Sequence, residues 1–252
     1  MARKVYFDYV NQRLGVAIYQ NMREIIPADI DVTIILSIKQ ILPSTNYFHY
    51  VMMSKMIMEN MGFTINHCQV LCNQGNTNID QLMSSALIFL AGGNPVEQMQ
   101  VIRYLALEPY LKEYNHGIIA GHSAGSMSMG KTVIEPPTCT FNYAGRKRDI
   151  KPIDTCSGLA LDELIVIPHL EEVNYRLNRI KIRTVGTWDV ADAPYLEMYE
   201  TPIIGLLDGS ALITDDERQI ILGAGAVEIQ NNKITKCMTT TTPQGRQLIL
   251  KR

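Results

Sequence analysis

The segment Gly121-His122-Ser123-Ala124-Gly125 places one serine among small residues, directly after the short apolar run 117–120. The pattern predicts a strand, a sharp turn and a helix, with the serine held in a strained conformation that requires small neighbours. The start of such a helix aims backbone N–H groups and the positive end of its dipole at the same point. Ser123 is therefore a candidate nucleophile, and the simpler alternative is a serine that caps a helix.

A second segment, Gly92-Gly93-Asn94, follows the apolar run 86–91. Glycines at this point let the backbone approach a ligand and present an N–H group to it. Parallel strands of an α/β sheet place their carboxyl ends at one edge, which is where such sheets bind ligands. We expect the N–H groups of Gly93 and Ala124 to stabilise an oxyanion there.

Two further predicted strands end in residues that could complete the chemistry. Pro168-His169 follows 164–167, and Asp208-Gly209 follows 203–206. Histidine can act as a general base for serine, and a carboxylate can orient the histidine. The order serine, histidine, acid differs from that of the α/β-hydrolase fold, in which the acid precedes the histidine, and this argues against that fold. The ring of His122 is expected to point away from Ser123, so that it packs or lies on the substrate side and does not act as the base.

The elements that must position these residues alternate along the chain. Strands are predicted at 32–38, 63–71, 86–91, 117–120 and 164–167, and helices at about 46–61, 96–113, 124–130 and 172–183. This alternation predicts an α/β fold, with a mostly parallel sheet flanked by helices on both faces. Short strands from residue 203 onward predict an antiparallel addition at one sheet edge. Residues 131–157 are expected to form a long loop beside Ser123, and the methionines of 46–61 to pack in the core.

Composition limits the classes of function. The chain has 252 residues, 19% of them charged, with a net charge of −2, and one domain spanning 1–252 is expected. A broad positive field is absent, so a nucleic-acid partner is not expected. No long apolar run predicts a membrane span, and the opening Met-Ala-Arg-Lys does not resemble a signal peptide, which predicts a cytoplasmic protein. Five scattered cysteines are expected to be reduced, and neither a metal ion nor an organic cofactor is expected.

Taken together, the motifs resemble the peptidase E and cyanophycinase family of serine peptidases. They are Gly92-Gly93-Asn94, Gly121-His122-Ser123-Ala124-Gly125, Ile167-Pro168-His169 followed by Arg176 and Arg179, and the segment 204–212. The resemblance implies a fold similar to class I glutamine amidotransferases, with serine in place of their elbow cysteine. It also implies a serine-type exopeptidase, of the dipeptidase E or cyanophycinase kind, that cleaves small peptides or isopeptides with an aspartyl residue.

The same resemblance assigns roles to individual residues. Ser123 matches the family nucleophile, His169 its general base, and Asp208 the acidic partner, where peptidase E has a glutamate. Glu135, in the region after the elbow, is the alternative acid. The family commonly has a glutamine where Glu97 stands here, next to Gln98.

Substrate binding is assigned to Asn94, Arg176 and Arg179. The planar guanidinium groups of the two arginines suit a substrate carboxylate. The alternative for these arginines is a solvated cationic helix face. The expected partner is a small peptide substrate, and the expected assembly a monomer or homodimer. Two other functions stay open: a catalytically silent protein that binds a small ligand, and an amidase or esterase that is not a peptidase.

Overall fold

The computed structural model describes residues 2–8, 12–37, 45–72, 77–135, 139–141, 147–150, 154–170, 180–183, 187–190, 201–216, 218–230, 233–238 and 248–251. The strands of its largest sheet are β1 (Arg3–Phe7), β2 (Asp29–Ser37), β3 (Thr64–Leu71), β4 (Leu87–Gly93), β5 (Ile118–His122), β14 (Ser210–Thr214), β15 (Arg218–Gly223) and β18 (Leu248–Lys251). Their order is β18-β15-β14-β1-β5-β4-β2-β3. The parallel pairs are β1 with β5, β5 with β4, β4 with β2 and β2 with β3. The pairs of β14 with β1, β15 with β14 and β18 with β15 are antiparallel.

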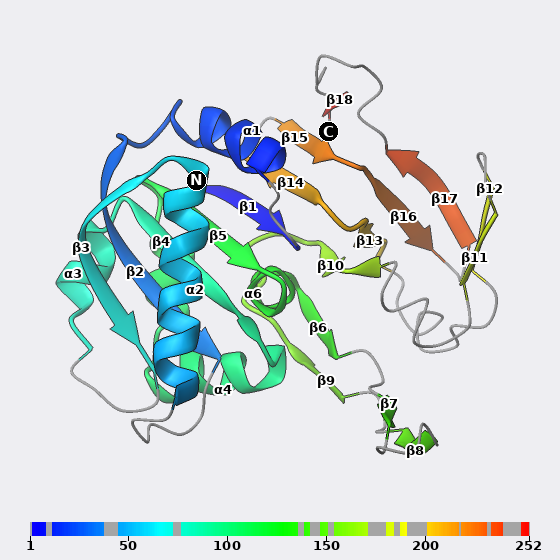
Figure 1. Cartoon of the computed structure of the whole chain (residues 1–252), viewed down its shortest axis with the longest axis horizontal. Coiled ribbons are helices and arrows are strands. Elements are labelled where there is room, and N and C mark those ends of the chain that lie inside the picture. Colours follow the sequence, from blue (N-terminus) through cyan, green and yellow to red (C-terminus); the bar gives the residue numbers. More distant parts are fainter. Residues whose placement is uncertain are drawn as a thin grey trace.

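Helices cover both faces of this sheet (Figure 1). They are α1 (Gln12–Met22), α2 (Thr45–Met61), α3 (Ile79–Ser84), α4 (Pro95–Tyr104), α5 (Glu108–Glu113) and α6 (Ala124–Met129). Side chains of a strand alternate between faces, so β1 sends Val5 and Phe7 to a core with α1 and α2. Tyr6 enters the opposite core, which includes residues of α3, α4, α5 and α6. The predicted α/β class with a mostly parallel sheet is confirmed.

A second sheet contains β10 (Ile165–Ile167), β13 (Ile203–Leu206), β16 (Ala226–Gln230) and β17 (Lys233–Met238), in the order β10-β13-β16-β17. The predicted antiparallel addition therefore does not lie at one edge of one sheet. β14 and β15 extend the main sheet, whereas β16 and β17 belong to this second sheet. The strand that precedes His169 is also in the second sheet, where β10 pairs in parallel with β13.

Three other expectations differ from the structure. The region 131–157 contains two antiparallel strand pairs: β6 (Thr132–Glu135) with β9 (Asp154–Ser157), and β7 (Cys139–Phe141) with β8 (Lys147–Ile150). The helix predicted at 96–113 is divided into α4 and α5. The end of the helix predicted at 172–183 is instead β11 (Ile180–Arg183), which pairs with β12 (Thr187–Val190).

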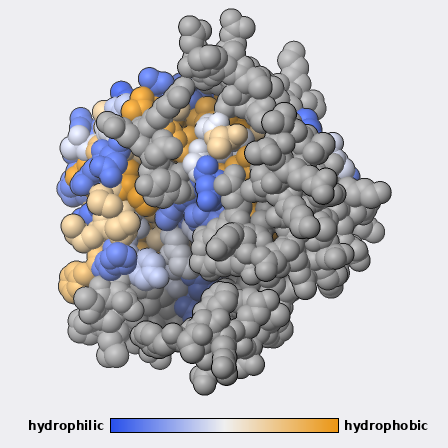
Figure 2. All heavy atoms as spheres, turned by 45° about the vertical axis from the view of Figure 1, so that its right-hand side comes forward, coloured by the Kyte–Doolittle hydropathy of each residue, from blue (hydrophilic) through white to orange (hydrophobic). Residues whose placement is uncertain are grey.

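The surface of α2 carries apolar side chains. Phe48, Met52, Met53 and Met56 are exposed, whereas Met58 and Met61 are buried, so only part of the methionine pattern packs in the core as expected. On the face of the molecule that Figure 2 shows, apolar and hydrophilic residues lie side by side. Among the described helices, none combines the length and hydropathy that a membrane span needs.

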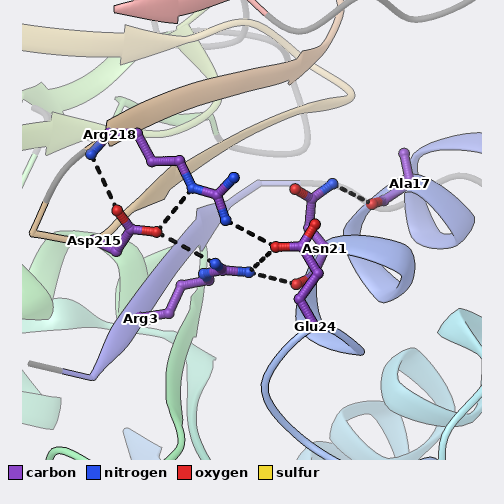
Figure 3. A network of polar contacts seen from close by, with 6 residues as sticks. All are labelled: Arg3, Ala17, Asn21, Glu24, Asp215 and Arg218. Carbon is purple, nitrogen blue, oxygen red and sulfur yellow. Dashed lines mark hydrogen bonds and ion pairs between the residues drawn. The ribbon is translucent and has the colours of Figure 1, made fainter. Parts of the chain in front are cut away.

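A network of charged side chains fixes the beginning of β1 (Figure 3). The guanidinium group of Arg3, only 6% exposed, contacts Glu24 at 2.9 Å and Asp215 at 3.3 Å. Arg218 contacts the same two carboxylates, at 2.8 and 3.0 Å. The network joins β1 to the turn after α1 and to the β14–β15 connection. The other end of β1 faces the candidate active site, where the carbonyl of Phe7 accepts a hydrogen bond from the backbone of Ser123.

Candidate active site

Ser123 lies in a sharp turn between β5 and α6. Its φ of 51° and ψ of −109° lie outside the regions that L-residues ordinarily occupy, and such strained residues cluster at functional sites. The backbone N–H of Ser123 donates a hydrogen bond to the carbonyl of Phe7 at 2.9 Å. The strand, turn and helix predicted around this serine are confirmed, and the tertiary structure holds the turn through β1.

The small residues around Ser123 are required by close backbone contacts. A Cβ atom added at Gly121 would lie 2.5 Å from the carbonyl carbon of Gly125 and the nitrogen of Ser126. A Cβ atom at Gly125 would lie 2.1 Å from the carbonyl oxygen of Leu90. These neighbours are backbone atoms that cannot give way easily. Glycine at both positions thus allows α6 to start directly against the ends of β4 and β5.

His169 faces Ser123 from the second sheet. Its Nε2 atom lies 3.0 Å from Oγ of Ser123, within hydrogen-bonding distance. It follows β10 and Pro168, and its φ of 52° turns the chain at that point. When Nδ1 carries the ring proton, Nε2 is free to accept the serine proton. The structure thus brings together the predicted nucleophile and the predicted base.

Two carboxylates lie beside Nδ1 of His169. Oδ1 of Asp208 is 3.7 Å away, and its side chain is 47% exposed. Oδ2 of Asp8 is 4.0 Å away, and its side chain is fully buried. Asp208 therefore lies where the sequence predicts the acid, and Asp8 is a second carboxylate that sequence reasoning missed. The run Lys4-Val5-Tyr6-Phe7 has the composition of a strand with Asp8 at its end, but this pattern alone does not mark a functional carboxylate.

The candidate oxyanion donors lie at the end of β4 and at the start of α6. β4 and β5 pair in parallel with Leu90 opposite Gly121, so Gly92 and Gly93 extend alongside the turn of Ser123. The hydroxyl of Ser37 donates a hydrogen bond to the carbonyl of Gly92 at 2.7 Å. Because the peptide unit is planar and trans, the N–H of Gly93 then points away from Ser37.

Gly93 also has a conformation that favours glycine. Its φ is 132°, and a Cβ atom there would lie 2.0 Å from Oγ of Ser37. On the other side of the site, Ala124 begins α6, so its N–H has no acceptor within the helix. The two peptide units predicted to bind an oxyanion are thus placed by specific local contacts.

The residues after Gly93 have structural contacts. Oδ1 of Asn94 accepts a hydrogen bond from the N–H of Glu97 at 2.9 Å and so caps α4. Gln98 is fully buried, and its amide group donates to the carbonyls of Ile35 at 3.2 Å and Ala91 at 2.9 Å. Gln98 therefore joins the ends of β2 and β4, whereas Glu97 is partly exposed. The substrate-binding role of Asn94 stays a prediction.

His122 packs beneath the turn, which is one of the two roles that the sequence left open for it. Its ring stacks on Phe7 with centroids 5.5 Å apart, and a Cβ atom at Gly92 would lie 2.9 Å from its Nδ1. Burial above all, and then the nearby His169, lower the pKa of His122 from 6.5 to about 4, although a hydrogen bond with the backbone of Asp8 acts in the opposite direction. His122 is therefore neutral at pH 7, and His169 is the base that faces the serine.

Three predicted site residues are not placed by the described part of the chain. Arg176 and Arg179 fall in 171–179, which lies outside the described residues. Glu135 is the last residue of β6, opposite Asp154, but its side chain lies outside the description as well. The choice between Asp208 and Glu135 therefore has geometric support only on the side of Asp208.

Solved structures of other proteins share this fold. A solved peptidase from an acI-B1 Actinobacterium matches with a TM-score of 0.58 and 13% identity, over 99% of this chain and 97% of that one. A Listeria monocytogenes EGD-e protein, described as a peptidase E protein, matches with a TM-score of 0.53 and 13% identity, over 87% of this chain and 98% of that one. At this identity, both matches bear on the fold alone.

A search of curated proteins finds no match. The model of one protein family, peptidase family S51, matches residues 43–222, which include Ser123, His169 and Asp208. This match extends over well more than half of the sequence. The chain therefore belongs to peptidase family S51.

Proposed function

We propose that this member of family S51 is a serine exopeptidase that cleaves small aspartyl peptides or isopeptides through an acyl-enzyme on Ser123. The observation that carries the proposal is the 3.0 Å separation between Nε2 of His169 and Oγ of Ser123. A nucleophile within hydrogen-bonding reach of a base, which is in turn flanked by a carboxylate, is the arrangement that activates a serine hydroxyl.

The proposed reaction begins when Oγ of Ser123 attacks the scissile carbonyl carbon and its proton passes to Nε2 of His169. The negative charge that develops on the carbonyl oxygen is stabilised by the N–H groups of Gly93 and Ala124. His169 then gives the proton to the leaving amine, and the C–N bond breaks. Water hydrolyses the ester on Ser123 by the same route in reverse. Asp208, beside Nδ1, supports the imidazolium form. This mechanism uses neither a metal ion nor an organic cofactor.

The aspartyl preference rests on the sequence resemblance and on Arg176 and Arg179, which follow His169 in the chain. A substrate carboxylate that enters a partly buried site needs a charged partner, because an unpaired buried carboxylate is strongly disfavoured. The guanidinium group provides two parallel N–H donors for such a carboxylate.

A fluorophosphonate probe tests the serine chemistry, since it reacts with an activated serine whatever the substrate. We expect labelling of the wild type at Ser123, located by peptide mass spectrometry, and no labelling of Ser123→Ala. A folded wild-type protein without labelling would favour a silent ligand-binding protein. A panel of α-aspartyl, β-aspartyl and neutral dipeptides then tests the substrate class. Hydrolysis of a simple ester, with no cleavage of any dipeptide in the panel, would favour the esterase alternative.

A further inference from the structure

The carboxyl end of β1 contacts the elements that carry the proposed nucleophile and base. The carbonyl of Phe7 accepts the hydrogen bond from the backbone of Ser123. Oγ of Ser126, in α6, lies 2.9 Å from both the nitrogen and the oxygen of Phe7. The next residue is Asp8, whose side chain lies beside His169. The end of β1 is therefore the place where the serine turn of the main sheet meets the histidine of the second sheet.

The carboxylate of Asp8 has a different neighbour at each oxygen. Oδ1 accepts hydrogen bonds from the backbone N–H groups of Gly209 at 3.1 Å and Ser210 at 3.2 Å. These two residues directly follow Asp208. Oδ2 lies 4.0 Å from Nδ1 of His169. One buried carboxylate thus joins the histidine to the turn that carries the other acid.

The two carboxylates beside Nδ1 differ in their surroundings. Asp208 is 47% exposed, so water screens its charge and leaves its side chain more conformational freedom. Asp8 is fully buried, and the two backbone N–H groups hold one of its oxygens in place. Hydrogen bonds of this kind favour the ionised form of a carboxylate, and a buried charge acts more strongly on its neighbour than an exposed one.

We propose that Asp8 is a positioning residue for the reaction: it orients the imidazole of His169 through Nδ1 and fixes the turn that carries Asp208. This inference rests on the proposed serine peptidase function. His169 then has two carboxylate partners, Asp8 and Asp208, and the buried Asp8 makes the larger contribution to catalysis. Asp8 acts through His169 and contacts no substrate.

The variant Asp8→Asn separates the electrostatic role from the structural one. Asparagine has the same shape, and its amide oxygen can still accept from Gly209 and Ser210, but the negative charge beside His169 is lost. We expect kcat to fall by roughly 10–100-fold, since general base catalysis as a whole contributes about 10²–10⁴-fold. We expect KM to stay within about twofold, because no substrate contact is removed.

The pH profile provides a readout that a merely structural role would not change. Asp8, Asp208 and Ser123 lie beside the ring of His169, and the nearby His122 is already neutral near pH 7. A negative charge favours the protonated imidazole, so Asp8→Asn should move the midpoint of the kcat/KM profile to lower pH. Asp208→Asn should produce a smaller shift in the same direction and a smaller loss of kcat.

The matched control is Asp162→Asn. Asp162 is also buried, and it contacts β1 through the hydroxyl of Tyr6 at 2.8 Å. Its removal should lower the melting temperature without moving the pH midpoint.

Because Asp208→Asn leaves the buried carboxylate intact, it tests the proposal even if Asp8→Asn does not fold. A loss of kcat in Asp208→Asn that exceeds about 100-fold would overturn the proposal.

Two more outcomes are decisive. A folded Asp8→Asn with kcat within twofold of wild type and an unchanged pH midpoint would also overturn the positioning role. Slower labelling of Ser123 by the fluorophosphonate probe in Asp8→Asn than in wild type would support it. If the wild type itself is not labelled, the proposed function fails, whereas equal labelling rates in wild type and Asp8→Asn would reject the role of Asp8 alone.

Discussion

Nε2 of His169 lies 3.0 Å from Oγ of Ser123, although the two residues are 46 positions apart and follow strands of different sheets. Ser123 follows β5 of the main sheet, and His169 follows β10 of the second sheet. The site is thus formed where two sheets meet, and the end of β1 contacts both sides.

Replacement of the nucleophile should abolish the covalent path without unfolding the protein. We expect Ser123→Ala to lose roughly 10³-fold or more of kcat/KM. Ser128→Ala is the matched control, because Ser128 is a buried serine of the same helix whose hydroxyl contacts the carbonyl of Ala124 at 3.1 Å. The control should stay within a few fold of wild type. Dipeptide hydrolysis and a thermal melt of each variant provide the measurements. An active Ser123→Ala variant would show that Ser123 is not the nucleophile.

Replacement of the base should not add to that loss. His169→Ala alone is expected to cost a factor similar to Ser123→Ala, because the two groups act in one step. The double variant should be little worse than either single variant. Losses that multiply would show that Ser123 and His169 contribute to separate steps.

Ser37→Ala tests whether the Gly92–Gly93 peptide has to be held in place. The hydroxyl of Ser37 binds the carbonyl of Gly92. Without it, the N–H of Gly93 is less firmly oriented toward the carbonyl oxygen of the substrate, on which the negative charge develops. Loss of a whole oxyanion donor typically costs about 10²–10³-fold, so a loosened donor should cost roughly 3–30-fold in kcat with little change in KM. Thr33→Val, which removes a buried hydroxyl from the same strand where it contacts Ser85, is the control. A Ser37→Ala enzyme with full kcat would contradict this role of Ser37.

His122 should make stability depend on pH. Its pKa falls from 6.5 to about 4 on folding, mainly because of burial, so between these values the unfolded chain binds more protons than the folded one. The free energy of unfolding should therefore rise with pH from about 4 to 6.5, by roughly 1–3 kcal/mol, and the full contribution is present above that range. Urea unfolding at several pH values measures it.

His122→Gln is expected to flatten this slope, because glutamine does not titrate. His67→Gln serves as the control, since the ring of His67 is 76% exposed and contacts only solvent and a surface carboxylate among its described neighbours. The same slope in wild type and His122→Gln would show that other groups govern the acid sensitivity.

The network at the beginning of β1 should contribute to stability at neutral pH and lose that contribution in acid. Hydrogen bonds from Arg218, and then from Arg3, lower the pKa of Glu24, while partial burial acts in the opposite direction. The contribution is therefore present above the unfolded value of about 4.5 and disappears as the pH falls through the lower folded value.

Glu24→Gln should reduce the free energy of unfolding at pH 7 by less than about 1 kcal/mol, because Glu24 is 48% exposed and water screens the pairs. The effect should shrink toward pH 3 and at high salt. Urea unfolding of Glu24→Gln, Arg218→Gln and the double variant measures the coupling between the two side chains. Additive effects would show that the pair is not coupled.

Arg176→Gln tests the substrate carboxylate. If Arg176 binds it, kcat/KM for aspartyl dipeptides should fall by roughly 10–100-fold, the range of about 1.5–3 kcal/mol for hydrogen bonds to charged groups, while neutral dipeptides are spared. Arg179→Gln is tested in the same way. Arg23→Gln is the control, because that guanidinium group binds the carbonyl of Ile26, after α1. Equal losses on acidic and neutral substrates would indicate a structural role.

The sequence by itself determined those features that depend on neighbouring residues. The strand, turn and helix around Ser123 follow from small residues at fixed spacing, and the structure shows why: Gly121 and Gly125 stand where a side chain would meet backbone atoms. The ends of β4, β10 and β13 were also predicted, because apolar runs that stop at Gly92, Pro168 and Asp208 are local patterns.

Only the tertiary structure decided how these segments meet. Periodicity does not state which strands share a sheet, so the placement of β10 and β13 in a second sheet, and the strand pairs within 131–157, could not be read from it. Asp8 was missed for the same reason. A carboxylate after a five-residue strand has no local signature of function. It becomes a candidate because folding brings it to 4.0 Å from His169 and buries it completely, across a sequence separation that no local pattern encodes.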